Sequence, residues 1–170
     1  MIIIEELVRL AQNRDADAFT RVMQSQMQNL YKAARAMLEN DEDAADAISD
    51  TILTCWEKLD QLKKPEYFRT WMTRILINKC NDILRKRNKV RLLGDESREI
   101  PFSPQEYDNV EWLETLKGLD EKYRMILILY YVNGLETSDI STALHIPVST
   151  VRTRLSRARD QLATLYHLEA

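Results

Sequence analysis

Glycine and proline are scarce in this chain: its 170 residues include three glycines and four prolines. Because helix-breaking residues are so few, beside abundant Leu, Ala, Lys, Glu and Arg, the composition predicts an all-α protein. No run of 18 apolar residues is present, and the N-terminal MIIIEELVRL lacks the basic end and long apolar stretch of a signal peptide. We therefore expect a cytoplasmic protein without membrane insertion.

Cysteine and histidine are also few. Cys55 and Cys80 lie among apolar residues in helical patterns, so we expect two buried thiols. His145 and His167 are not spaced with the cysteines as metal ligands are. The sequence has no glycine-rich phosphate loop, and no Cys–His or paired-carboxylate arrangement typical of catalysis. We expect no metal, no cofactor, no small-molecule substrate and no enzymatic activity.

Charge is strongly segregated along the chain, although the net charge is only −3. Residues 61–91 carry ten Lys and Arg against two Asp and Glu, whereas residues 1–60 carry six against twelve. Residues 92–122 are acidic again, with three against nine. A basic segment can contact phosphates, while an acidic face repels DNA and suits a basic protein partner.

Helical periodicity predicts two small helical domains. Apolar residues recur at three- and four-residue steps over 2–38, about 43–59 and about 67–89, and helical character resumes from 110 to the C-terminus. Residues 90–109 have two prolines, many acids and no sustained periodicity. We interpret them as a flexible acidic linker between domains at 1–89 and 110–170, with a relaxed span of about 25 Å.

The sharpest motif is a helix-turn-helix over residues 137–162. A helix at about 137–144 is followed by the turn His145-Ile146-Pro147 and a second helix at about 148–165. On a helical wheel the second helix buries a stripe beginning at Val151 and turns small hydroxyls bracketed by arginines outward. Such a face suits the major groove of DNA, since small residues permit close approach and arginine bonds guanine or phosphate. The alternative is an ordinary amphipathic helix with a solvated arginine face. The predicted DNA-contacting residues are Ser149, Thr150, Arg152, Thr153, Arg154, Ser156 and Arg157.

A second motif occupies residues 41–89. Tyr67, Phe68 and Trp71 lie among Lys63, Lys64, Arg69 and Arg74, and aromatic rings beside cations suit unstacked bases of single-stranded DNA. The alternative is that Phe68 and Trp71 are core residues at helical spacing. Asp43, Asp46 and Asp50 share one face of the preceding helix; that face is either simply solvated or binds a protein partner.

The two motifs together resemble extracytoplasmic function (ECF) sigma factors. AADAISD (44–50) stands where that family usually has AEDLVQE, and residues 70–87 match its W-x-x-x-I-x-x-N-x-x-x-D-x-x-R pattern from Trp71 to Arg85. Residues 119–162 are similar to the family's LPxxxRxVxxLxxxxGxSxxEIAxxLxIPxGTVxxRLxRARxxL. The chain departs from the family at Ala45 and Ser49, which replace Glu and Gln, at Asp120, which replaces Pro, and at Ser149, which replaces Gly.

The resemblance implies a subunit that directs core RNA polymerase to promoters and opens DNA at the −10 element, with the helix-turn-helix on the −35 element. It implies three partners: core polymerase, promoter DNA and an anti-sigma factor. The residues expected at the −10 element are Lys63, Lys64, Tyr67, Phe68, Arg74, Asn78, Lys79 and Arg85. Those expected at the polymerase are Asp43, Asp46, Ile48, Asp50, Leu53 and Trp56.

Two other functions stay open on the sequence alone. A stand-alone helix-turn-helix regulator would bind duplex DNA without polymerase, usually as a dimer. A degenerate sigma-like module would only occupy a protein partner, and weak polymerase binding through the altered helix at Ala45 and Ser49 would favour that alternative.

Overall fold

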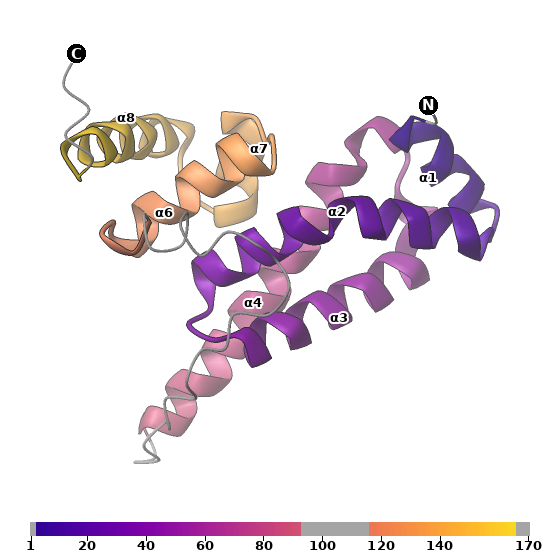
Figure 1. The fold of residues 1–170 in the computed structure, drawn as a ribbon, viewed down its shortest axis with the longest axis horizontal. Helices are drawn as coiled ribbons and strands as arrows, with labels where there is room; N and C mark the ends of the chain where they lie inside the picture. Colours follow the sequence, from indigo (N-terminus) through magenta and orange to yellow (C-terminus); the bar gives the residue numbers. More distant parts are fainter. Residues whose placement is uncertain (1–2, 93–115, 166–170) are drawn as a thin grey trace. The chain divides into compact units, whose positions relative to one another are not determined.

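The computed structural model describes residues 3–92 and 116–165, and every element in these two ranges is a helix (Figure 1). The prediction of an all-α protein is confirmed. The chain divides into two compact units, Met1–Ile100 and Pro101–Ala170. Most of the predicted linker, from residue 93 to 109, lies outside the described residues, as do the apolar positions Val110 and Leu113.

The first unit is built on three long helices, α2, α3 and α4, which pack against one another, with the short α1 lying along α2 (Figure 1). Its elements are α1 (Ile4–Gln12), α2 (Ala16–Met37), α3 (Asp41–Lys58), the 3-10 turns η1 (Leu59–Gln61) and η2 (Pro65–Tyr67), and α4 (Phe68–Leu92).

One helix was expected over residues 2–38, and the structure breaks it in two. Arg14 adopts a left-handed φ of 67°, which ends α1 and turns the chain. Asp15 then caps α2 by accepting a hydrogen bond from the backbone nitrogen of Ala18 at 3.1 Å. The break was not predicted because the left-handed residue is an arginine and not a glycine.

The core of the first unit is apolar and includes both thiols. The side chains of Leu30, Leu59, Met72, Leu76 and Ile77 are at most 1% exposed. Cys55 and Cys80 are free and fully buried, so that prediction is confirmed. Burial raises the pKa of each thiol to about 12.

Polar groups fix the corner between α2 and α3. The hydroxyl of Tyr31 donates to Asp41 at 2.8 Å, and the Arg35 guanidinium lies 3.3 Å from the same oxygen. Arg35 also donates to the carbonyl of Leu38 at 2.9 Å. Burial, followed by the hydrogen bond to Asp41, raises the pKa of Tyr31 to about 12. Asn40 caps α3 by accepting from the backbone nitrogen of Asp43 at 2.8 Å.

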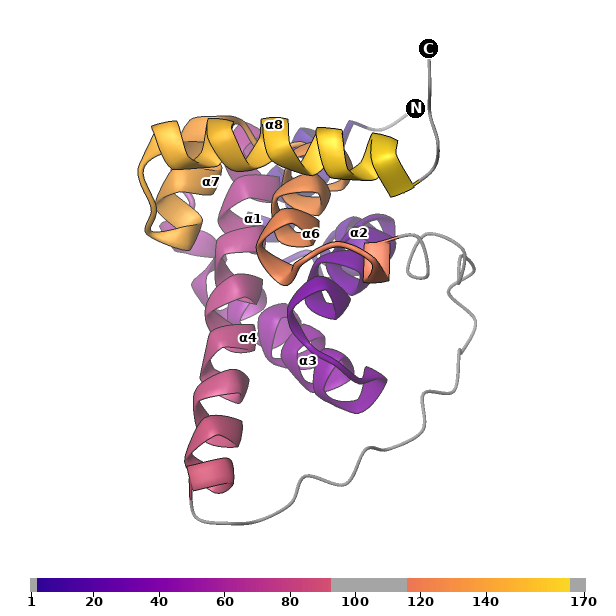
Figure 2. The same cartoon turned by 90° about the vertical axis from the view of Figure 1, so that its left-hand side faces the viewer.

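In the part of the second unit that the structure describes, a helix-turn-helix packs on the helix that precedes it. Its elements are α6 (Glu121–Leu127), which runs on into the π-helix η3 (Ile128–Val132), then α7 (Thr137–Leu144) and α8 (Val148–Leu165). Helix α8 packs on α6 and α7 (Figure 2). His145 ends α7 with a left-handed φ of 56°, and the Ser141 hydroxyl holds the turn by donating to the carbonyl of Ile146 at 2.6 Å.

Candidate nucleic-acid interfaces and acidic face

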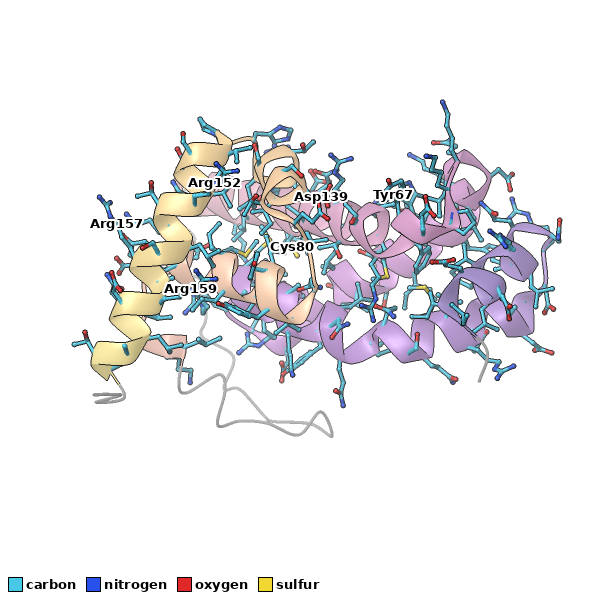
Figure 3. All side chains as sticks on the ribbon, turned by 90° about the horizontal axis from the view of Figure 1, so that it is seen from above. Tyr67, Cys80, Asp139, Arg152, Arg157 and Arg159 are labelled. Carbon is cyan, nitrogen blue, oxygen red and sulfur yellow. The ribbon has the colours of Figure 1, made fainter. Side chains whose placement is uncertain are left out.

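Helix α8 has the two faces that its sequence predicts. Val151, Leu155 and Ala158 are at most 5% exposed and pack into the second unit. On the opposite side, Ser149, Arg152, Thr153, Ser156 and Arg157 are exposed, and Thr150 and Arg154 are half-buried. Figure 3 shows Arg152 and Arg157 along this helix. The seven predicted residues therefore form one outward surface, which we call the α8 surface.

A pocket of about 320 Å³ opens on the α8 surface, and its wall includes one residue that sequence reasoning missed. Lys122, near the start of α6, lies in it together with Arg154 and Arg157, so three cations line one hollow with several hydroxyls. The Nζ atom of Lys122 lies 5.0 Å from the centre of the Tyr123 ring. Clustered cations with hydroxyl donors are suited to a phosphate group. The full lining is Lys122, Tyr123, Ser149, Thr150, Thr153, Arg154 and Arg157.

The loop before α4 presents one exposed aromatic ring and two exposed lysines. Its ends are anchored, since Leu62 is 7% exposed and Phe68 is 1% exposed. Between these anchors Lys63, Lys64 and Tyr67 are exposed, and Lys64 Nζ lies 5.8 Å from the centre of the Tyr67 ring. Tyr67 is 55% exposed and is labelled in Figure 3. We call Leu62–Phe68 the basic loop.

Phe68 was predicted to contact DNA, and its burial argues against that role. Its ring packs against Trp71, with the ring centres 6.0 Å apart. A phenyl ring at the first position of an amphipathic helix is removed from water when that face packs on the core. Phe68 therefore anchors the basic loop, and Tyr67 is the exposed ring of that loop.

The basic loop continues into one face of α4. Arg74, Asn78 and Arg85 follow one another at steps of four and seven residues, so they share one side of α4. Asn78 and Arg85 are exposed, while Arg74 and Lys79 are half-buried. Arg85 Nη1 lies 3.4 Å from a carboxylate oxygen of Asp82 on the same exposed face.

Helix α3 separates the predicted polymerase-contacting residues into two groups. Asp46, Asp50 and Leu53 are exposed. Leu53 is 56% exposed, although leucine is one of the residue types most often buried. Glu42 and Glu57 continue the same exposed stripe by helical spacing, although sequence reasoning did not single them out. We call these five residues the acidic face.

The other three residues predicted on α3 point inward. Ile48 is 6% exposed and belongs to the core. The carboxylate of Asp43 pairs with Arg87 of α4 and accepts from the Asn40 amide at 3.1 Å.

Trp56 is half-buried; its ring centre lies 4.9 Å from that of Phe19, with the two rings tilted, and the Arg14 guanidinium lies 5.1 Å from it. Asp43, Ile48 and Trp56, which were predicted to bind the polymerase, therefore have contacts within the fold, whereas Asp46, Asp50 and Leu53 are exposed.

Comparison with known proteins assigns the family. Residues 22–90 match the sequence profile of Sigma-70 region 2, and residues 109–162 match that of Sigma-70, region 4. The chain is 30% identical over 133 residues to RNA polymerase sigma factor SigV of Bacillus subtilis, an alignment that covers 77% of this chain and 80% of SigV. The chain belongs to the ECF RNA polymerase sigma factors.

Three further proteins are similar to this chain, the last of them in fold alone. ECF RNA polymerase sigma factor SigW of Bacillus subtilis is 26% identical over 95% of both chains. The solved structure of CnrH in complex with the cytosolic domain of CnrY has a TM-score of 0.66 and 26% identity, and it covers 98% of this chain and 99% of CnrH. The sigma factor RpoE of Bartonella quintana, solved with the anti-sigma factor NepR, shares the fold with a TM-score of 0.68 and 23% identity.

This sigma factor directs RNA polymerase to promoters, and the expected resemblance is confirmed. The region 2 match includes α3, the basic loop and α4, and the region 4 match includes the α8 surface. No helix among residues 3–92 and 116–165 is long and apolar enough to cross a membrane.

Proposed function

We propose that the basic loop and α4 bind and open the −10 element, that the α8 surface reads the −35 element, and that the acidic face docks on core RNA polymerase. The observation that carries this proposal is the basic loop, where one exposed tyrosine follows two exposed lysines directly before a basic helix. A ring in this setting can stack on a base that has left the duplex, while the cations hold its backbone.

The −35 assignment depends on the shape and charge of the α8 surface. Ser149, Thr153 and Ser156 are small, so α8 can lie close to base edges in the major groove. Arg152 and Arg157 flank these hydroxyls and can bond guanine bidentately or clamp phosphates. Lys122 joins this interface through the pocket that it shares with Arg154, and we assign it to a backbone phosphate.

The −10 assignment follows α4 away from the basic loop. Arg74, Asn78, Lys79 and Arg85 continue from Tyr67 along the helix, so a displaced strand can run over them. Asn78 can donate to and accept from a base edge, and the cations neutralise phosphates. Promoter opening would then consist of capturing a base that has already unpaired, which favours the open state by mass action.

The polymerase assignment rests on Leu53 within the acidic face. An exposed leucine surrounded by carboxylates combines apolar burial with charge attraction to a basic partner surface. The negative charge of the acidic face also repels DNA, so this face is not expected to bind DNA as the basic loop and α4 do.

We further propose that an anti-sigma factor covers these same surfaces when the protein is inactive. CnrH was solved with the cytosolic domain of CnrY, and the Bartonella quintana protein with the anti-sigma factor NepR. We place this sigma factor in the cytoplasm with the polymerase, which carries out the chemistry of RNA synthesis while the sigma factor acts only by binding.

Tyr67→Ala tests the −10 assignment in reconstituted holoenzyme on a promoter chosen by that holoenzyme from a randomised library. Stacking of one base contributes roughly 1–3 kcal/mol, so we expect open complexes, measured by permanganate reactivity of unpaired thymines, to form about tenfold more slowly. Tyr131→Ala, in the other unit, is the comparison for loss of an exposed ring: Tyr131 is 58% exposed, and its hydroxyl accepts from Arg159, which is not among the predicted DNA-contacting residues. Normal opening by Tyr67→Ala would refute the role of the basic loop.

A further inference from the structure

The corner between α1 and α2 holds the start of the basic loop. The side-chain amide of Gln12 donates to the carbonyl of Leu62 at 2.9 Å and to that of Leu59 at 3.2 Å. An amide nitrogen has two hydrogens, so both donors are used. Leu62 is the first residue of the basic loop, and Figure 1 shows α1 beside this part of the chain.

Gln12 adds support that the loop does not provide for itself. Within the loop region, the backbone nitrogen of Leu62 donates to the carbonyl of Leu59 at 3.2 Å, and that of Tyr67 donates to Lys64 at 3.0 Å. The bond from Gln12 comes instead from a helix 50 residues earlier in the chain. It therefore ties the loop to the body of the first unit.

Arg14 contacts the end of α3 and the turn η1, which lead into the loop. Its Nη1 donates to the carbonyl of Trp56 at 2.8 Å, and its Nη2 lies 3.1 Å from a carboxylate oxygen of Asp60. The guanidinium also covers the Trp56 ring. Arg14 has the left-handed φ of 67°, a conformation that non-glycine residues retain where surrounding contacts hold it.

We infer that Gln12 and Arg14 are positioning residues for recognition of the −10 base, and that they set the selectivity of the basic loop without touching DNA. This rests on the proposed role of that loop. Both residues lie outside the region 2 match, which begins at residue 22. A loop fixed at its base loses less freedom when it binds, so Tyr67 and its lysines meet one base in one geometry. Without these contacts the loop would accept other bases more readily.

The test measures base discrimination by reconstituted holoenzyme. The rate of open-complex formation is compared between the selected promoter and templates changed at single −10 or −35 positions. The chosen −10 position is the one at which Tyr67→Ala relaxes the preference. A destabilised variant lowers the active fraction of protein equally on every template, so this loss cancels in the ratio of opening rates on two templates. Thermal melts check that each variant is folded.

Three variants remove the contacts in different ways. Gln12→Ala deletes the amide, Gln12→Glu keeps its size but directs a carboxylate at two carbonyls, and Arg14→Gly removes the guanidinium while tolerating the left-handed backbone. We expect each to reduce discrimination at the chosen −10 position about five- to tenfold and to leave −35 discrimination unchanged. Gln28→Ala, at an exposed glutamine of α2, should change neither.

The outcomes separate this inference from the proposed function. The positioning role is overturned if all three variants keep base discrimination within twofold of the unmodified protein while Tyr67→Ala loses that discrimination. If Tyr67→Ala also keeps full discrimination, the basic loop does not read the base, and the assignment of the loop and this inference both fail. Equal losses at the −10 and −35 positions would likewise overturn a role specific to the loop.

Discussion

At the scale of single residues, exposure decides which of the predicted side chains can act. Tyr67 and Phe68 are neighbours and both aromatic, yet one is 55% exposed and the other 1%. Asp46 and Asp43 are three residues apart on one helix, yet Asp43 is already paired with Arg87. The residue type gives the chemistry that is possible, and packing determines whether the group is available to a partner.

Arg152 and Lys122 are proposed to make two different kinds of DNA contact on the α8 surface. Arg152→Ala should relax preference at one −35 position, at a cost of about 1–3 kcal/mol, because an arginine that bonds a base edge discriminates between bases. Lys122→Ala should weaken holoenzyme binding evenly on all −35 sequences and reduce the slope of log affinity against log salt by about one, because it contacts phosphate. Equilibrium binding across −35 variants at several salt concentrations distinguishes the two, and a sequence-specific effect of Lys122→Ala would contradict its assignment.

The buried thiols predict how the protein responds to alkali. Cys55 and Cys80 have pKa values raised to about 12 by burial, and Tyr31 is raised to about 12 as well. Because each folded pKa lies above its unfolded value, the stabilisation is complete below pH 8 and declines as the pH rises toward 12. Chemical denaturation should show falling stability over that range.

Thiol reactivity provides an independent check of the same burial. At pH 8 a disulfide reagent should modify neither cysteine in the folded protein and both cysteines in denaturant, because the reactive thiolate is suppressed in the core. Rapid modification of the folded protein, or stability that rises between pH 9 and 12, would contradict this account.

At the scale of elements, α3 separates an inner face from an outer one. Ala44, Ala47, Ile48 and Cys55 pack inward, while the acidic face points outward with Leu53 among its carboxylates. The helix can therefore be altered on its outer side without disturbing the core.

Charge reversal on α3 tests its role. Asp46→Lys with Asp50→Lys should weaken binding to core polymerase at least tenfold, because two attractive charge pairs become repulsive. Glu5→Lys with Glu6→Lys makes the same change in charge on exposed positions of α1 and serves as the control. Binding can be measured by fluorescence anisotropy of a labelled sigma factor at two salt concentrations. Equal effects of both pairs would show that net charge, and not the acidic face, controls assembly.

The sequence predicts elements well where periodicity is regular. The faces of α8 follow from Val151, Leu155 and Ala158, since a regular stripe identifies the buried side of a helix. The end of α1 could not be predicted, because the left-handed residue that follows it is Arg14 and not a glycine. Lys122 was missed for a related reason: it joins the α8 surface across a gap of more than 25 residues, and no local pattern records that proximity.

At the scale of the whole molecule, the segregation of charge agrees with the proposed division of tasks. The acidic residues of α3 precede the basic residues of the loop and α4, so adjoining segments are suited to different macromolecules. With a net charge of −3 the protein should bind DNA weakly by itself. Binding to polymerase would place two weak DNA-binding regions near one promoter, and the second contact would then gain from a high effective concentration.

Run-off transcription from a randomised promoter library, with and without bacterial core polymerase, tests this account most directly. We predict selective transcripts only when the sigma factor and core polymerase are both present, with enriched sequences in both the −10 and −35 elements. Tight, sequence-specific duplex binding by the chain alone, with no transcripts when core polymerase is added, would contradict the account.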